Sequence, residues 1–250
     1  MLDGARLPIV SSPGCMPFVI LFNGRTGSSH LTELLRSHPE IRARGERLGR
    51  EARQGRKGQG DQLAWARETL EPRRRLRAVG FKTKLSVIDD AAGFADLLRE
   101  RDVRVVHMER RNVIKAAVSA VNASRLRSLG LTSNLREGVE RPEYAPISEA
   151  ELRERIENRE HWSRELSSFV AGLGLETLEI AYEDLLTDER GTVDRVLAFL
   201  EVPPAPLKSP VRKLTPDDLH VALPNFDELR AAFAGTPYEP MFDEVLVPAA

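Results

Sequence analysis

The sequence predicts an α/β fold in which an open parallel β-sheet is flanked by helices on both faces. Short apolar runs rich in Val, Ile and Phe alternate along the chain with longer segments whose apolar residues recur at helical spacing. Glycine, proline and helix-capping residues separate the two kinds of segment. Because these signals run nearly throughout and no internal repeat is visible, we expect a single domain over residues 1–250, with an irregular leader at 1–16.

In the N-terminal part, apolar runs bounded by glycine or proline mark the strands, and apolar residues three or four apart mark the helices. In chain order we expect a strand at Pro17–Phe22, a helix around Leu31, Leu34 and Leu35 that Pro39 helps to end, a loop at 40–60, a helix at Asp61–Leu70 and a strand at Ala78–Phe81. The chain therefore begins with a strand, a glycine loop and a helix in direct succession.

Capping residues and prolines set the boundaries in the rest of the chain. We expect a helix capped by Asp89 or Asp90 with Phe94, Leu97 and Leu98 inward, a strand at Val103–Met108, a helix capped by Asn112 and an irregular segment at 126–147. There follow a long helix from the Ser148/Glu151 capping box with Trp162 and Leu166 inward, a strand at Glu176–Ala181, a helix over Val193 to Leu200 and a last helix from Asn225 to Phe233. Open parallel sheets of this kind bind ligands beyond the carboxyl ends of their strands.

The overall composition indicates a globular protein with no general attraction to nucleic acid or membranes. The net charge is −1, with 41% hydrophobic and 30% charged residues. The apolar run Phe18–Phe22 is too short to span a bilayer, and we recognise no signal peptide. Cys15 is the only cysteine, which excludes an internal disulfide or a cysteine-based metal cluster and predicts a cytoplasmic location.

One stretch departs from this even balance of charge. Between Arg42 and Arg77 there are twelve basic and five acidic residues. Two interpretations are open: a solvated face, which the interrupting Gly55, Gly58 and Gly60 favour, or a rim that attracts an anionic donor or substrate.

The first strand ends in the loop Gly24-Arg25-Thr26-Gly27-Ser28-Ser29, which has the properties of an anion site. Glycine permits close backbone approach, and the first N–H groups of the following helix lack internal partners and attract negative charge. The hydroxyls of Thr26, Ser28 and Ser29 and the guanidinium of Arg25 add donors. No lysine follows Gly27, so the nucleotide-triphosphate loop pattern is missing, as is the dinucleotide fingerprint. An ordinary turn rich in glycine and serine is the alternative.

A second anion site is predicted where the strand at 103–108 runs through Glu109-Arg110-Arg111-Asn112 into a helix. Ser119 lies eight residues after Arg111, about 12 Å along a helix, and an arginine side chain closes most of that distance. Arg111 and Ser119 could therefore grip one phosphate from two sides; the alternative is a capped helix with an exposed arginine pair. Taken together, the two motifs predict a ligand with two separate anionic groups.

These two motifs resemble the sulfotransferase superfamily, particularly the bacterial carbohydrate-type branch related to nodulation-factor and glycolipid sulfotransferases. The segments that carry the resemblance are 18–41, with the glycine loop, and 105–119, with weaker matches at 80–84, 180–185 and 225–229. The resemblance implies a P-loop-like α/β fold and 3′-phosphoadenosine 5′-phosphosulfate as the sulfuryl donor. The donor's 5′-phosphosulfate would lie on Arg25, Thr26, Gly27, Ser28 and Ser29, and its 3′-phosphate on Arg111 and Ser119. Two departures are visible: Arg25 stands where the cytosolic branch has lysine, and that branch's C-terminal glycine-rich donor loop has no clear counterpart.

The resemblance also implies catalytic residues. Glu46 follows the His38-Pro39-Glu40-Ile41 stretch, where the related carbohydrate enzymes carry a glutamate, and is the candidate base; the alternative is a solvated acid among arginines, which would lower its pKa. Arg25 would stabilise the leaving phosphate. Lys82 would contact the substrate or the leaving oxygen, or is simply a charged residue at a strand end. His38 and His107 are weaker candidates, and a structural role is expected for His107. No divalent metal is required.

Other functions remain open at this point. A P-loop-type kinase or nucleotide hydrolase shares the strand–loop–helix site, and a non-catalytic nucleotide-binding or scaffold protein would bind the ligand without turnover. The acceptor, a sugar hydroxyl by family analogy, is not encoded in a motif. The loops 42–60 and 126–147 are expected to shape its pocket.

Overall fold

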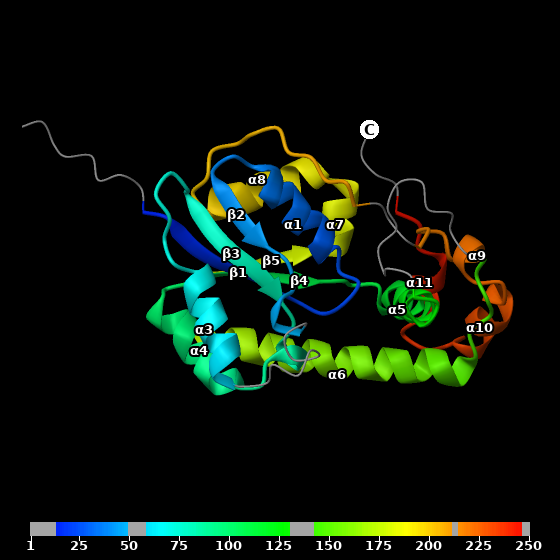
Figure 1. Cartoon of the computed structure of the whole chain (residues 1–250). Helices are drawn as coiled ribbons and strands as arrows, with labels where there is room; N and C mark the ends of the chain where they lie inside the picture. Colours follow the sequence, from blue (N-terminus) through cyan, green and yellow to red (C-terminus); the bar gives the residue numbers. More distant parts are fainter. Residues whose placement is uncertain (1–13, 50–58, 131–142, 212–214, 247–250) are drawn as a thin grey trace, which may run out of the picture.

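The computed structural model describes residues 14–49, 59–130, 143–211 and 215–246 and confirms the α/β fold (Figure 1). Five parallel strands form one sheet in the order β2-β3-β1-β4-β5. The strands are β1 Met16–Phe22, β2 Ile41–Arg44, β3 Ala78–Thr83, β4 Arg104–Glu109 and β5 Thr177–Ala181. The helices are α1 Ser28–Ser37, α3 Gln59–Thr69, α4 Ala91–Glu100, α5 Val113–Ser128, α6 Glu149–Leu173, α7 Tyr182–Thr187, α8 Glu189–Phe199, α9 Leu219–Ala222, α10 Phe226–Ala232 and α11 Glu239–Asp243, with a short 3₁₀ turn at Leu85–Val87.

The central strand β1 is apolar because both of its faces are covered. Phe18, Ile20 and Phe22 pack into one core with α1 and α8, and Val19 and Leu21 pack into a second core with α3, α4 and the C-terminal part of α6. Alternate side chains of a strand point to opposite faces, so a continuous apolar run is what a doubly covered strand requires. Figure 1 shows the two helical layers above and below the sheet.

A third apolar cluster lies beside the sheet rather than on it. It joins α5 and the N-terminal half of α6 to α9, α10 and α11 (Figure 1). Phe226, Phe233 and Phe242 form its centre, with ring centroids 5.6 Å apart for Phe233 and Phe242. This cluster packs the C-terminal segment against α5, the helix that follows β4.

The predicted strands and caps are largely confirmed. The strands expected at 17–22, 78–81, 103–108 and 176–181 correspond to β1, β3, β4 and β5 within two residues at either end. Asp90, Asn112 and Ser148 cap α4, α5 and α6 by accepting a backbone N–H three residues on, at 2.8, 2.8 and 3.2 Å. Within the described ranges, no helix is long and apolar enough to cross a membrane.

The prediction of a loop over 40–60 is wrong in part, because β2 occupies Ile41–Arg44. The part of that loop at 50–58 lies outside the described residues. So does the part at 131–142 of the irregular segment predicted at 126–147. β2 is an edge strand of four residues in which buried Ile41 and Ala43 alternate with Arg42 and Arg44. Two arginines in four residues leave too few apolar positions to reveal the strand in the sequence.

Two further expectations are corrected towards the C-terminal end. The Asn225 side chain does not cap α10; its carbonyl accepts from the Ile147 N–H at 3.2 Å and its amide donates to the Ile147 carbonyl at 2.9 Å. The helix after Asn225 is not the last one, since α11 follows it. Trp162, expected to face inward, is 39% exposed because its ring lines a cavity instead of the core.

Candidate active site

The glycine loop joins β1 to α1 at the carboxyl edge of the sheet. Arg25 and Gly27 have φ angles of 70° and 74°, in the left-handed region. A Cβ on Gly27 would lie 2.8 Å from the Tyr182 ring, so the turn and its packing against α7 both require glycine here. The first N–H groups of α1, which lack partners within the helix itself, therefore directly follow a tight turn, as an anion site needs.

A cavity of about 990 Å³ opens beyond the carboxyl ends of the strands, and the glycine loop forms part of its wall. Its other walls come from the end of β2, the segment after β3, α5, α6 and α7. The basic residues that line it are Arg25, Lys84, Arg110, Arg127, Arg155, Arg159 and Arg190, and the acidic ones are Glu46, Asp188 and Glu189. This excess of positive charge is complementary to a ligand with several anionic groups.

Three arginines converge beside the glycine loop although they come from distant parts of the chain. Arg25 Nε donates to Ser119 Oγ at 2.9 Å, and Arg159 Nη1 donates to the Gly24 carbonyl at 2.7 Å. The guanidinium carbon of Arg110 lies 4.3 Å from the centroid of the Tyr182 ring. Like charges held this close repel one another, and a bound anion would relieve that repulsion.

The electrostatics of these arginines reflect their crowding. Burial, and then the neighbouring Arg110, lower the pKa of Arg25 to about 10. Burial and Arg110 act in the same order on Arg159 and lower its pKa to about 10. Both side chains are still cationic at neutral pH. The Nε of Arg110 is buried and has no hydrogen-bond partner within the described part of the chain.

A second charged cluster contributes Glu46 and Lys84 to the cavity wall, with Lys82 buried behind them. Glu46, after β2, lies 3.4 Å from Lys82 Nζ and 3.1 Å from Lys84 Nζ. Lys82 Nζ also donates to Ser29 Oγ at 2.8 Å and lies 3.4 Å from Ser28 Oγ. One lysine therefore connects the candidate base to the serines of the glycine loop.

Competing effects determine the ionisation of this cluster. Burial is the largest single effect on Glu46 and raises its pKa, but Lys84 and Lys82 together outweigh it, so the pKa lies below its usual value. The sequence predicted a lowered pKa for Glu46, and the direction of the shift is confirmed. The shift is caused by two lysines, from β3 and the segment after it, and not by the adjacent arginines. Burial lowers the pKa of Lys82, and Glu46 partly opposes that shift.

Comparison with known proteins identifies relatives over almost the whole chain. No protein-family model matches the sequence. Nodulation protein H of Rhizobium tropici is 29% identical over 94% of this chain and 96% of its own length. Nodulation protein H of Rhizobium meliloti is 27% identical over 91% of this chain and 95% of its own length. These matches agree with the branch that the two anion motifs indicated from the sequence.

These relatives support a place for the chain in the sulfotransferase superfamily, with the nodulation-factor type. Among solved structures, a sulfotransferase from Alicyclobacillus acidocaldarius aligns with this chain at a TM-score of 0.49 and 16% identity. The alignment covers 92% of this chain and 95% of that protein.

The arginine predicted for the second anion motif does not line this cavity. Arg111 is exposed and forms an ion pair with Asp184. Arg110 lines the cavity instead, and the side chain that contacts Ser119 is that of Arg25. Successive residues after a strand project in opposite directions, and a spacing along the sequence does not show which of two adjacent arginines faces the ligand.

Three other predicted residues of the sulfotransferase lie away from the cavity wall or have local roles. Thr26 is buried, and its hydroxyl donates to the Asn23 carbonyl at 3.0 Å, which stabilises the turn. His38 is buried and uses both ring nitrogens in hydrogen bonds, to the Pro203 carbonyl and the Glu40 N–H. His107 is buried in β4 and does not line this cavity.

Sequence reasoning missed the contribution of α6 to the site. Arg155, Arg159 and Trp162 all line the cavity of the sulfotransferase. They lie four and three residues apart, so they share one face of the helix. A basic and aromatic stripe at this spacing was visible in the sequence and is the signal that could have found them. Among the described residues, no group of three or more His, Cys, Asp and Glu side chains is placed to hold a metal ion.

Proposed function

We propose that this sulfotransferase moves a sulfuryl group from 3′-phosphoadenosine 5′-phosphosulfate to a hydroxyl of a carbohydrate-type acceptor. The observation that carries the proposal is that the two predicted anion motifs meet in one cavity, with Arg25 of the first donating to Ser119 of the second at 2.9 Å. The donor carries anionic groups at its 5′ and 3′ ends. A single cavity with two adjoining cationic regions suits such a ligand.

The donor's 5′-phosphosulfate is assigned to the glycine loop. The N–H groups at the start of α1, the hydroxyls of Ser28 and Ser29 and the guanidinium of Arg25 supply its donors, and Thr26 contributes through its backbone. The 3′-phosphate is assigned to Ser119 and Arg110. Arg159 supports both regions, since it binds the loop carbonyl of Gly24 and lines the same wall.

The catalytic step follows from the cluster around Glu46. The acceptor oxygen forms a bond to sulfur while the bond from sulfur to the 5′-phosphate oxygen breaks, and Glu46 takes the hydroxyl proton. Negative charge grows on the leaving 3′-phosphoadenosine 5′-phosphate. Arg25 and Lys82, which lies 2.8 Å from Ser29 Oγ, supply positive charge at the glycine loop where it develops.

The acceptor is assigned to the side of the cavity where Glu46, Lys84 and Ser86 line the wall. Trp162, which is 39% exposed, lines the same cavity, and a flat apolar ring beside polar groups suits one face of a sugar. The nodulation-protein relatives support a carbohydrate-type acceptor. Glu46 belongs to one of the two loops predicted to shape this pocket and lines the cavity. Arg127 also lines it, but this part of the loop predicted at 126–147 is the last turn of α5.

Binding of the donor product tests the proposal directly. We expect 3′-phosphoadenosine 5′-phosphate to bind with a Kd below about 100 µM in isothermal titration. AMP, which differs only by lacking the 3′-phosphate, is the matched control and should bind more weakly. Labelled donor should then transfer sulfate to a member of a carbohydrate acceptor panel in the presence of EDTA. No binding at high micromolar ligand would contradict the donor assignment, transfer from ATP with magnesium would indicate a kinase, and binding without turnover of any acceptor would indicate a non-catalytic protein.

The choice between adjacent arginines gives a second prediction. Arg110→Ala should weaken binding of 3′-phosphoadenosine 5′-phosphate roughly 10- to 100-fold, because hydrogen bonds to charged groups contribute about 1.5–3 kcal/mol. Arg111→Ala removes the same charge one residue away, outside the cavity, and should change the affinity less than twofold. If Arg111→Ala weakened binding more than Arg110→Ala, the 3′-phosphate would have to be assigned to Arg111 instead.

A further inference from the structure

The first turn of α5 contains a buried lysine that the proposed chemistry does not use. The Lys115 side chain is only 2% exposed, and its Nζ lies 2.6 Å from Asp217 Oδ2 and 3.7 Å from Glu244 Oε2. A buried ammonium persists only when it is paired, so these contacts are required by the position of the lysine. Both carboxylates belong to the C-terminal segment 215–246, which one cation thus joins to α5.

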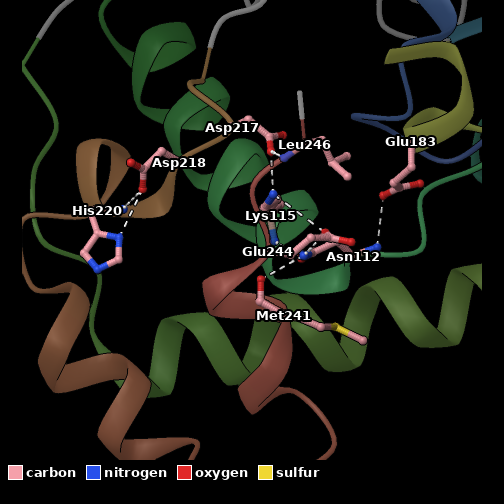
Figure 2. A network of polar contacts seen from close by, with 9 residues as sticks. All are labelled: Asn112, Lys115, Glu183, Asp217, Asp218, His220, Met241, Glu244 and Leu246. Carbon is pink, nitrogen blue, oxygen red and sulfur yellow. Dashed lines mark hydrogen bonds and ion pairs between the residues drawn. The ribbon is translucent and has the colours of Figure 1, made fainter. Parts of the chain in front are cut away.

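Asn112, the cap of the same helix, completes the network that Figure 2 shows. Its side-chain amide donates to the Met241 carbonyl at 2.8 Å and to Glu244 Oε2 at 2.6 Å. Asp217 Oδ2 accepts in addition the backbone N–H of Leu246 at 2.6 Å. Two separate parts of the C-terminal segment, near residue 217 and at 241–246, are therefore fixed to a single helical turn.

The same segment reaches the cavity two residues before Asp217. Thr215 is buried, lines the cavity, and its hydroxyl lies 3.5 Å from Ser119 Oγ. Lys115 and Ser119 are four residues apart and so share one face of α5. Asp217 pairs with Lys115 and Thr215 contacts Ser119, so the two contacts lie one helical turn apart along that face.

We propose that Lys115 is a positioning residue for donor binding. By pairing with Asp217 it holds Thr215 against Ser119, where the threonine hydroxyl donates to the same phosphate that Ser119 and Arg110 bind. Lys115 itself contacts no ligand. The inference rests on the proposed function for the identity of the ligand, but the mechanical link between Lys115 and the segment at 215–217 is independent of it.

Hydrogen exchange of the ligand-free protein tests the mechanical link. In Lys115→Met the ion pair between Lys115 and Asp217 is lost, and backbone amides at 215–222 should exchange faster while the strands of the sheet keep their protection. Arg230→Ala is the matched control, because Arg230 forms an exposed ion pair with Asp243 in the same segment, away from the cavity. It should leave exchange at 215–222 unchanged. Unaltered protection in Lys115→Met would overturn the proposal.

Ligand affinity tests the positioning role. Lys115→Met and Thr215→Val should each weaken binding of 3′-phosphoadenosine 5′-phosphate, by roughly tenfold as for loss of one charged hydrogen bond. The double variant should bind no more weakly than either single one, because both changes remove the same contact. Additive losses, or unchanged affinity in Lys115→Met, would overturn the positioning role.

Two controls keep the outcomes separate. Should Lys115→Met not fold, Asp217→Asn removes the same ion pair with little change of shape, and it is expected to produce the same faster exchange and weaker binding. Wild-type protein that fails to bind 3′-phosphoadenosine 5′-phosphate would refute the proposed function, while the exchange comparison, which needs no ligand, would still decide the role of Lys115.

Discussion

Glu46→Gln is expected to lower kcat about 10²- to 10⁴-fold while leaving the affinity for 3′-phosphoadenosine 5′-phosphate nearly unchanged. The amide keeps the shape of the side chain but accepts no proton from the acceptor hydroxyl. Because Lys84 and Lys82 hold the carboxyl pKa below its usual value, the wild-type base is ionised at neutral pH and loses activity only as the pH falls through that lowered pKa. Turnover with labelled donor, measured across pH, should lose this acid limb in the variant.

The control for this experiment is Glu40→Gln. Glu40 pairs with Arg77 at 3.4 Å and does not line the cavity, so its loss should leave kcat within a factor of two. A Glu46→Gln enzyme with wild-type turnover would assign the base to another residue. A variant that also loses donor affinity would indicate that Glu46 mainly orders Lys82 beside the serines of the glycine loop.

Arg25→Ala is expected to have the second large effect, a loss of about 10²- to 10³-fold in kcat/KM, comparable to the removal of one preorganised donor from a developing anion. Arg25 contacts Ser119 and lies in the glycine loop, so its loss affects both ends of the donor. Arg25→Lys should recover part of the activity, because lysine restores the charge but not the planar fork. Steady-state kinetics with varied donor concentration would measure both variants.

Arg67→Ala provides the comparison for Arg25. Arg67 forms an exposed ion pair with Glu100 at 2.6 Å, distant from the cavity wall, and its removal should leave kcat/KM unchanged. If Arg25→Ala retained more than half of the wild-type kcat/KM, the positive charge at the leaving group would have to come from Lys82 or Arg159 instead.

The fold was predictable because its information is local. A strand buried on both faces, such as β1, must be a continuous apolar run, and the caps at Asp90, Asn112 and Ser148 accept N–H groups only three residues away. The edge strand β2 escaped prediction, since half of its residues are arginines. β2 is stabilised by its pairing with β3, and a contact of that kind leaves no pattern in the sequence of the strand itself.

The site was only partly predictable because its contacts are not local. The sequence led to Glu46, but its charged partners, Lys82 and Lys84, lie more than thirty residues further along the chain. The motif led to Ser119 and Arg111, but in the structure Arg25 contacts Ser119 and Arg111 pairs with Asp184. Spacing identifies which segments approach a ligand, whereas packing decides which side chain of each segment faces it.

The strand order places β1 and its loop in the middle of the sheet, with a different task on either side. Glu46, Lys82 and Lys84 come from β2, β3 and the residues after them, whereas Arg110 and Ser119 come from β4, α5 and the turn between them. Under the proposed assignments, substitutions among the wall residues of the β2–β3 flank act on the acceptor and its deprotonation, whereas substitutions on the β4–α5 flank act on the hold on the donor's 3′-phosphate.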